Sequence, residues 1–147
     1  MATREKPVRL QLRAGYPRRV SILIVDGHRG VSELIRRNIE TSGIRVFEAA
    51  TGIDGIRLLG EHAIDLLLLD PSLPDVDVQV FLNRCRHLYP GEGLPRIIFM
   101  SDEPPDRLLM RRFNIETCVP KPFDMRDLME RIERVFKPDS VKPGASN

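Results

Sequence analysis

Five short apolar runs are spaced along the chain, separated by longer segments of mixed polarity. The runs are rich in leucine and β-branched residues and are too short for helices, so they predict strands. A uniformly apolar run such as Leu66–Leu69 is typical of a strand covered on both faces. The predicted strands are residues 21–25, 44–48, 65–69, 96–100 and 117–120. Because proline lacks the N–H donor that a central strand needs, Pro120 places the last strand at an edge of the sheet.

The segments between the runs have the spacing of amphipathic helices. Thr51 and Asp124 are predicted to cap the second and fifth helices, and Gly43 to end the first. Pro104 and Pro105 are expected near the first turn of a short fourth helix. The apolar positions expected to face the core are Val31, Leu34, Ile35 and Ile39, then Ile53, Ile56 and Leu59, then Val78, Phe81, Leu82, Cys85 and Leu88, then Leu108, Leu109 and Phe113, and finally Met125, Leu128, Met129, Ile132, Val135 and Phe136.

Strands that alternate with helices imply an α/β fold in which right-handed crossovers build a parallel sheet. The fold class we expect is flavodoxin-like: a doubly wound, five-stranded sheet in the order 2-1-3-4-5 with five helices. In that order the first and third strands are neighbours at the centre of the sheet. Asp26 and Asp70, which end these two strands, should therefore face each other.

A polar residue ends four of the predicted strands: Asp26, Asp70, Ser101 and Lys121. The carboxyl ends of parallel strands meet at one rim of the sheet, where such folds bind their ligands. Two carboxylates, a hydroxyl and an ammonium in one crevice suit a phosphoryl group held together with a divalent cation. Asp26 also has an ordinary alternative, because an aspartate at this point can simply cap the following helix.

The length of 147 residues fits one domain with terminal extensions. We expect a basic N-terminal extension over residues 1–19, a folded domain over 20–137 and a disordered tail over 138–147. The first 20 residues carry six basic side chains against Glu5. Such an arm can bind an acidic partner, but only Tyr16 is available to stack on a base. A solvated arm is therefore favoured, and nucleic acid is not an expected partner.

Hydropathy and cysteine content point to a cytoplasmic protein without a membrane partner. No apolar run approaches the roughly 20 residues of a membrane-spanning helix, and the basic N-terminus lacks the apolar stretch of a secretory signal. Cys85 and Cys118 are too few for a disulfide framework and show no metal-binding spacing. Both are expected to act as small apolar residues.

Four motifs in this order resemble a known family. They are LIVD at 23–26, LLLLDPSLPDVD at 66–77, IIFMS at 97–101 and KPF at 121–123. Each motif alone is weak, but the set is similar to the CheY-like receiver domain of bacterial two-component response regulators. The resemblance covers residues 20–136, most of the chain.

The resemblance implies a role for each residue at the rim. Asp70 is similar to the phosphoacceptor, which attacks the phosphohistidine of a partner kinase. Asp26 is similar to one of the acids that bind Mg²⁺, together with Asp70 and the backbone carbonyl of Ser72. Ser101 is similar to the hydroxyl that bonds the phosphoryl group and shifts on phosphorylation. Lys121 is similar to the lysine that pairs with the phosphoacceptor, and a cis Lys121–Pro122 bond is implied.

Several residues depart from the family pattern. Gly27 stands where a second metal-binding acid is usual, so weakened Mg²⁺ binding is expected. His28, Asp102 and Glu103 are candidates to compensate, although His28, His62 and His87 show no ligand spacing and also read as surface residues. Cys118 replaces the aromatic switch residue, Val78 replaces a glycine, and Pro104 and Pro105 suggest a remodelled helix 4–strand 5–helix 5 face.

These observations leave two main hypotheses. The first is a receiver, not an enzyme, that accepts phosphate from a sensor histidine kinase or phosphotransfer protein and signals to an effector protein. A homodimer through the helix 4–strand 5–helix 5 face belongs to this hypothesis, and residues after Phe136 are too few to fold as an output domain. The second is a phosphate-independent interaction or dimerisation module, which Gly27 and Cys118 favour. A nucleotide-binding enzyme is disfavoured because residues 26–30 lack a GxGxxG loop.

Overall fold

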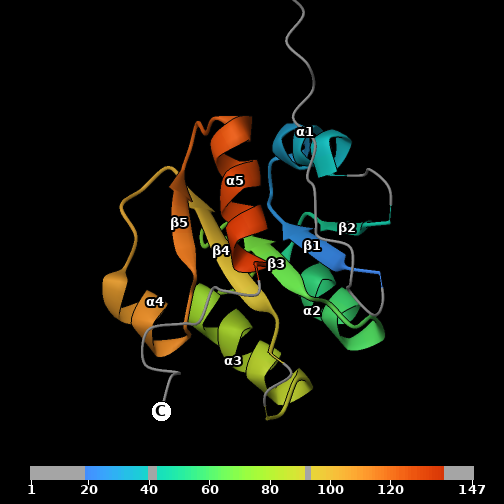
Figure 1. Ribbon diagram of the computed structural model, residues 1–147. Coiled ribbons are helices and arrows are strands. Elements are labelled where there is room, and N and C mark those ends of the chain that lie inside the picture. The colour runs from blue at the N-terminus through green and yellow to red at the C-terminus, as the bar shows by residue number, and fades with distance from the viewer. Residues whose placement is uncertain (1–18, 40–42, 92–93, 138–147) are drawn as a thin grey trace, which may run out of the picture.

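Five parallel strands form the centre of the computed structural model, which describes residues 19–39, 43–91 and 94–137 (Figure 1). The strands are β1 (Ser21–Val25), β2 (Arg45–Ala49), β3 (Leu66–Leu69), β4 (Arg96–Ser101) and β5 (Thr117–Pro120). Their order is β2-β1-β3-β4-β5, which confirms the predicted flavodoxin-like topology. The expected basic extension, apart from Arg19, and the expected tail over 138–147 lie outside the described residues.

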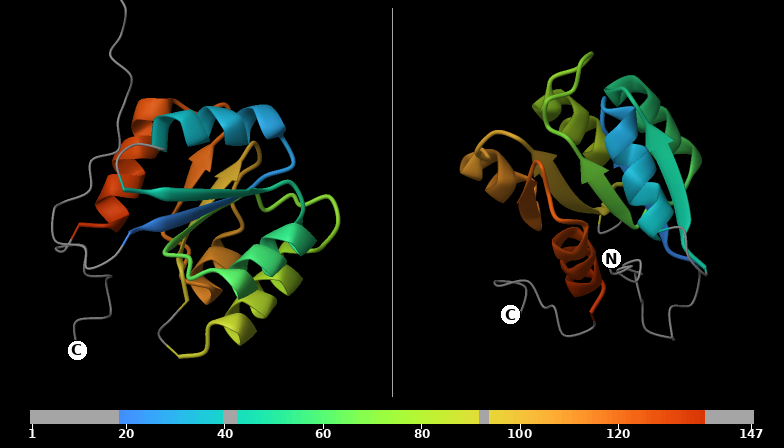
Figure 2. Two further views of the ribbon diagram at one scale, coloured as in Figure 1. Left: turned by 90° about the vertical axis from the view of Figure 1, so that its right-hand side faces the viewer. Right: turned by 90° about the horizontal axis from the view of Figure 1, so that it is seen from above.

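Two layers of helices cover the sheet (Figure 2). Helices α1 (Arg29–Ile39) and α5 (Met125–Val135) lie on one face. Helices α2 (Gly52–Glu61), α3 (Val78–Leu88) and α4 (Arg107–Arg112) lie on the other. None of the helices in the described part of the chain is long and apolar enough to cross a membrane.

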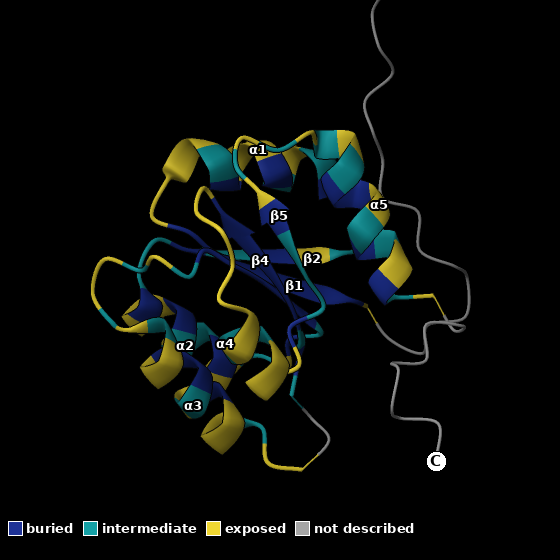
Figure 3. Cartoon of the chain, turned by 90° about the vertical axis from the view of Figure 1, so that its left-hand side faces the viewer, coloured by how far each residue is buried: buried dark blue, intermediate teal, exposed yellow. Residues whose placement is uncertain are grey.

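The alternation of side chains along the strands divides the core in two. Ile22 and Ile24 of β1 pack with α1 and α5, whereas Leu23 and Val25 pack in the cluster under α2, α3 and α4. Every residue of β1 and β3 is buried, and Figure 3 shows β1 in dark blue. This explains why their sequences are apolar without alternation. As predicted from Pro120, β5 is an edge strand.

Four apolar residues predicted to face the core are exposed instead: Leu34 (52%), Ile53 (66%), Leu88 (41%) and Leu108 (77%). On α1, Ser32 is buried in place of Leu34. An α-helix turns about 100° per residue, so Ser32 lies only about 20° from the direction of Ile39, and Leu34 about 140° from it. The apolar stripe was therefore predicted on a face that is rotated from the true one.

The inward face of α2 carries glycines where apolar side chains were predicted. Gly52, Gly55 and Leu59 are buried, while Ile53 points outward. A Cβ atom on Gly55 would lie 2.9 Å from the Cγ2 atom of Val25. The helix thus approaches β1 closely because no side chain stands between them.

Helix ends follow the predicted chemistry in most places. Thr51 Oγ1 accepts from the Asp54 amide at 3.2 Å, and Asp124 Oδ1 accepts from the Arg126 amide at 2.8 Å, so both predicted caps are confirmed. The short helix α4 begins only after its cap, Asp106. Pro104 and Pro105 therefore lie just before the first turn of this helix, near it as predicted.

Candidate functional site

Asp26 and Asp70 lie side by side because their strands are neighbours at the centre of the sheet. Each backbone amide extends the ladder of hydrogen bonds: Asp26 N donates to Ala49 O at 3.0 Å, and Asp70 N donates to Val25 O at 2.9 Å. Both residues are buried, with 1% and 5% of their surface exposed. The backbone thus fixes two carboxylates at the rim of the sheet, as the order of elements predicted.

Lys121 joins the two carboxylates. Its Nζ atom donates to Asp26 Oδ2 at 2.5 Å and to Asp70 Oδ2 at 2.8 Å. The lysine directly follows β5, and its own amide donates to the Ser101 carbonyl at 2.8 Å, which holds it against β4. The Lys121–Pro122 peptide bond is cis, as the resemblance implied. One ammonium group thus contacts two carboxylates that lie far from it in the sequence: Asp70 is 51 positions before the lysine and Asp26 is 95 positions before it.

The carboxylates keep this ammonium charged. Burial alone would lower the pKa of Lys121, but its hydrogen bonds to Asp26 and Asp70 and their negative charges outweigh burial, so the pKa is raised. One positive charge then faces two negative ones. The excess negative charge can attract a further cation. Asp70 also has a positively charged partner in Lys121, but it shares that ammonium with Asp26.

The remaining oxygen of Asp26 faces His28. Asp26 Oδ1 accepts from the His28 amide at 2.8 Å and lies 3.1 Å from the ring atom Nδ1. The Asp26 carboxylate therefore has two partners: one oxygen bonds the turn before α1, and the other bonds Lys121. The bond to Lys121 argues against the alternative that Asp26 only caps the helix. The His28 side chain is 72% exposed, yet its inner edge reaches the site. His28 is therefore a surface residue that contacts a rim carboxylate, and its role in compensating for Gly27 stays a prediction.

The remaining oxygen of Asp70 is held by its own loop. Asp70 Oδ1 accepts from the Ser72 amide at 2.8 Å. Ser72 thus lies directly beside the carboxylate, and the role of its carbonyl as a metal ligand stays a prediction.

Asp75, further along the same loop, is a residue that the sequence reasoning missed. Its two oxygens accept from the amides of Gly52 (2.8 Å) and Ile53 (3.0 Å) at the start of α2. These bonds, that from Ile53 first, lower the pKa of Asp75 below its usual value. An acid in a loop beside a helix N-terminus was the available signal, but the sequence does not say which helix the loop meets.

Ser101 lies at the end of β4 as its last residue and is buried, 4% exposed. Its Oγ accepts from the Glu103 amide at 3.1 Å. The next two residues, Asp102 and Glu103, are exposed. Among the described residues, neither belongs to the group of side chains that could hold a metal ion, and a compensating role for them stays a prediction.

Cys118 lies opposite Phe99 on the edge strand and is half-buried. Burial raises the pKa of its thiol, and the nearby Arg131 only partly opposes this. Arg131, from α5, donates to the Cys118 carbonyl at 3.2 Å and to Thr117 Oγ1 at 2.6 Å. The Arg131 guanidinium therefore joins α5 to β5 by hydrogen bonds at Thr117 and Cys118.

Three side chains could hold a divalent cation: Asp26, His28 and Asp70 each offer a ligand atom, and these atoms lie within 4.8 Å of one another. The two carboxylates fit Mg²⁺, which prefers oxygen. The imidazole does not share this preference, and Gly27 supplies no side chain. There is space for one, because a Cβ atom on Gly27 would meet nothing closer than Ala50 O at 3.7 Å. These three ligands thus fit a divalent cation, but they do not select Mg²⁺ over other divalent cations.

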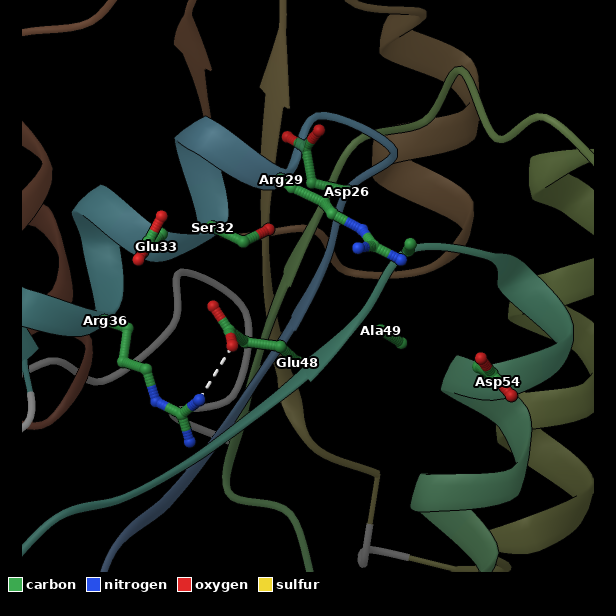
Figure 4. Close-up of a pocket in the computed structure, with 9 residues that line it drawn as sticks. Asp26, Arg29, Ser32, Glu33, Arg36, Glu48, Ala49 and Asp54 are labelled. Carbon is green, nitrogen blue, oxygen red and sulfur yellow. Dashed lines mark hydrogen bonds and ion pairs between the residues drawn. The ribbon is translucent and has the colours of Figure 1, made fainter.

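A pocket of about 470 Å³ opens on the α1–α2 side of Asp26 (Figure 4). Arg36 and Glu48 form an ion pair at 2.8 Å on its wall, and the Arg29 side chain reaches across toward the end of β2. Asp26 belongs both to this pocket and to the carboxylate pair. A ligand entering the pocket would therefore come up against the rim.

Comparisons with known proteins agree with this geometry. Residues 22–133 match the profile of the response regulator receiver domain. Response regulator MprA from Mycobacterium sp. strain KMS is 29% identical over 127 residues, which cover 85% of this chain and 54% of that protein. The chain thus spans about half the length of the curated relatives it matches.

Two solved structures are similar over most of the chain. One is a CheY-like response regulator receiver domain protein from Methanospirillum hungatei JF-1, with a TM-score of 0.71 and 25% identity over 80% of this chain and 93% of that one. The other is the receiver domain of the hybrid histidine kinase CckA, with a TM-score of 0.65 and 28% identity over 80% of this chain and 99% of that one.

Proposed function

This chain belongs to the response regulator receiver domain family, and from that premise we propose that Asp70 accepts a phosphoryl group from a histidine kinase or phosphotransfer protein. The chain would act in the cytoplasm as a phosphorelay component and pass the signal on by protein contacts. The observation that carries the proposal is the single ammonium of Lys121 held between the Asp26 and Asp70 carboxylates.

The chemistry follows from this arrangement. An oxygen of Asp70 attacks phosphorus, an O–P bond forms, and the N–P bond of the donor phosphohistidine breaks with its electron pair returning to the imidazole. Lys121 lowers the repulsion between the attacking carboxylate and the phosphoryl oxygens. A divalent cation, held by Asp26, Asp70 and the Ser72 carbonyl, would neutralise further charge on those oxygens when bound.

Ser101 supports a switching role. Its hydroxyl oxygen accepts from Glu103 at the same rim, and a hydroxyl can also donate. Once Asp70 carries a phosphoryl group, we expect Ser101 to donate to a phosphoryl oxygen and to draw the β4–α4 segment toward the rim. An added phosphoryl group brings up to two negative charges, enough to bias a loop between two arrangements.

The output surface would be α4, β5 and α5. Leu108 is 77% exposed on α4, and the same helix carries the exposed Arg107, Arg111 and Arg112. We propose that this face contacts a downstream effector or a second copy of the chain. Cys118 is too small to transmit the Ser101 movement as a ring would, so the path is expected to run through the backbone of β5.

The test is incubation of the protein with acetyl phosphate and Mg²⁺, followed by intact-protein mass after a rapid quench. The wild type is expected to gain one phosphoryl group and Asp70→Asn none. Asp102→Asn is the matched control, because Asp102 is an exposed aspartate near the same rim, and it should be labelled like the wild type. Labelling of Asp70→Asn would remove Asp70 from the proposed role.

A second function is favoured by two residues. Gly27 removes one acid from the metal site, and Arg131 pins the strand at Cys118. A phosphate-independent interaction module would need neither metal nor a mobile β5. Absence of labelling in the wild type, with no detectable metal binding, would select this function over the first.

A further inference from the structure

His28 brings a nitrogen ligand to a rim that otherwise offers oxygen. Its Nδ1 atom lies 3.1 Å from Asp26 Oδ1, and ligand atoms of His28, Asp26 and Asp70 lie within 4.8 Å of one another. Two adjacent ligands of one ion, each about 2.1 Å from it, are separated by roughly 3.0–3.4 Å. The imidazole and the carboxylate are therefore already spaced as neighbouring ligands of a single cation.

We propose that His28 is a ligand of the cation at this rim, in the place that Gly27 leaves without a carboxylate. The site would then bind a borderline transition dication such as Ni²⁺ or Co²⁺, and this affinity would depend on the imidazole. Such ions accept imidazole readily, whereas Mg²⁺ favours oxygen and retains its water. The inference rests on the proposed function only in placing the cation beside Asp70.

The surroundings allow this coordination without rearranging the fold. The ring is 72% exposed, so a small turn about its side-chain torsions costs no packing. Asp26 Oδ2 and Asp70 Oδ2 are bonded by Lys121, whereas Asp26 Oδ1 faces His28. The cation would approach from the solvent side and share Asp26 with the lysine.

Nitrogen and oxygen sites in general bind Ni²⁺ more tightly than earlier divalent metals. The preference over Mg²⁺ is therefore not diagnostic by itself. The diagnostic comparison is between two losses in His28→Ala: the fold-loss of Ni²⁺ affinity and the fold-loss of Mg²⁺ affinity.

The experiment is calorimetric titration of the full chain, free of any histidine tag, with NiCl₂ and separately with MgCl₂. His28→Ala is expected to weaken Ni²⁺ binding at least about tenfold and to leave Mg²⁺ affinity within about twofold. His87→Ala is the control, because His87 is exposed on α3 and its ring bonds only its own helix at Asn83 O among the contacts described. It should change neither affinity.

Two results would overturn the proposal. Equal Ni²⁺ affinity in His28→Ala and His87→Ala would show that the imidazole is not a ligand. A parallel loss of Ni²⁺ and Mg²⁺ affinity would show that His28 acts by holding Asp26 in place.

Cobalt gives a second measurement, since the visible absorption of bound Co²⁺ should change in His28→Ala. None of these titrations contains a phosphodonor, so their failure is separate from a failure of Asp70 to accept phosphate.

Discussion

One ammonium and two carboxylates set the character of the rim. The Asp26 side chain is fully buried and that of Asp70 is 7% exposed, so water cannot screen their mutual repulsion well. Lys121 offsets it by contacting both. Loss of the lysine would leave like charges facing each other, which is among the costlier changes a folded protein can undergo.

Lys121→Met is therefore expected to lower the free energy of unfolding by about 3 kcal/mol at neutral pH. Urea denaturation checks this, with Arg107→Met at an exposed position of α4 as the control. Because the pKa of Lys121 is raised from 10.5, its stabilisation is fully present below that pH and is lost as pH rises through the folded-state pKa. Equal stability of the two variants at neutral pH would contradict this account of the rim.

At this scale the sequence predicted the strand-end residues well and their loop partners poorly. Asp26, Asp70 and Lys121 were placed correctly because a parallel sheet brings the ends of its strands together whatever its loops do. The contact of His28 with Asp26 depends on the turn between β1 and α1. The bonds of Asp75 depend likewise on the conformation of the β3–α3 loop, and neither conformation is encoded in a hydrophobic pattern.

Helix and loop elements explain how the rim is held in place. The β3–α3 loop, which begins at Asp70, is fastened to α2 by Asp75. Gly52 lies at the start of that helix, and a Cβ atom there would come within 2.2 Å of Val76 Cγ1 and 3.2 Å of Leu73 Cδ1. The β3–α3 loop and α2 therefore form one unit, because the Asp75 carboxylate bonds the two and Gly52 has no side chain to hold them apart.

The Asp75 contact predicts a pH dependence. Its pKa is lowered in the folded protein, so its stabilisation is present above the unfolded value of about 3.8 and is lost as pH falls through the folded-state pKa. Asp75→Ala should have a lower Tm than the wild type at pH 7, and the difference should shrink below about pH 4. Asp102→Ala, at an exposed aspartate, should show no such difference. A Tm gap that persisted unchanged at low pH would exclude the carboxylate bonds as its source.

The Gly52 contact predicts opposite effects of one substitution at two sites. Gly52→Ala should destabilise the protein by about 1–3 kcal/mol, because Val76 must move. Gly30→Ala, in α1 with nothing within 4 Å of the added Cβ, should stabilise it by roughly 0.5–1 kcal/mol. Chemical denaturation of both variants checks the pair. Equal effects would mean that the β3–α3 loop yields freely and does not brace α2.

Over the part of the chain that the structure describes, the helices were predicted correctly in number and order, but some of their inward faces were predicted wrongly. Periodicity selects apolar positions and cannot see that Ser32 and Gly55 turn inward. Ser32 faces a polar pocket at the rim, and Gly55 lets α2 approach β1. These exceptions lie at or near the site, where packing requirements and chemistry compete.

At the scale of the whole molecule, the topology does most of the positioning. The parallel pairing of β1 with β3 is sufficient to bring Asp26 and Asp70 together, and the match of residues 22–133 to the receiver family agrees with this. The chain spans about half of its curated relatives. We therefore base the proposed effector contacts on the α4–β5–α5 face of this chain, and not on the activity of the longer relatives.

The most direct test of the central claim is to locate the phosphoryl group. The protein would be treated with acetyl phosphate and Mg²⁺, reduced with borohydride to convert an acyl phosphate to a stable alcohol, and sequenced by tandem mass spectrometry. We predict conversion of Asp70 alone. In Lys121→Met the conversion should fall to about a tenth of the wild-type extent or less, because the charge that favours attack is gone. Conversion at Asp26 or another carboxylate, with Asp70 untouched, would contradict the account.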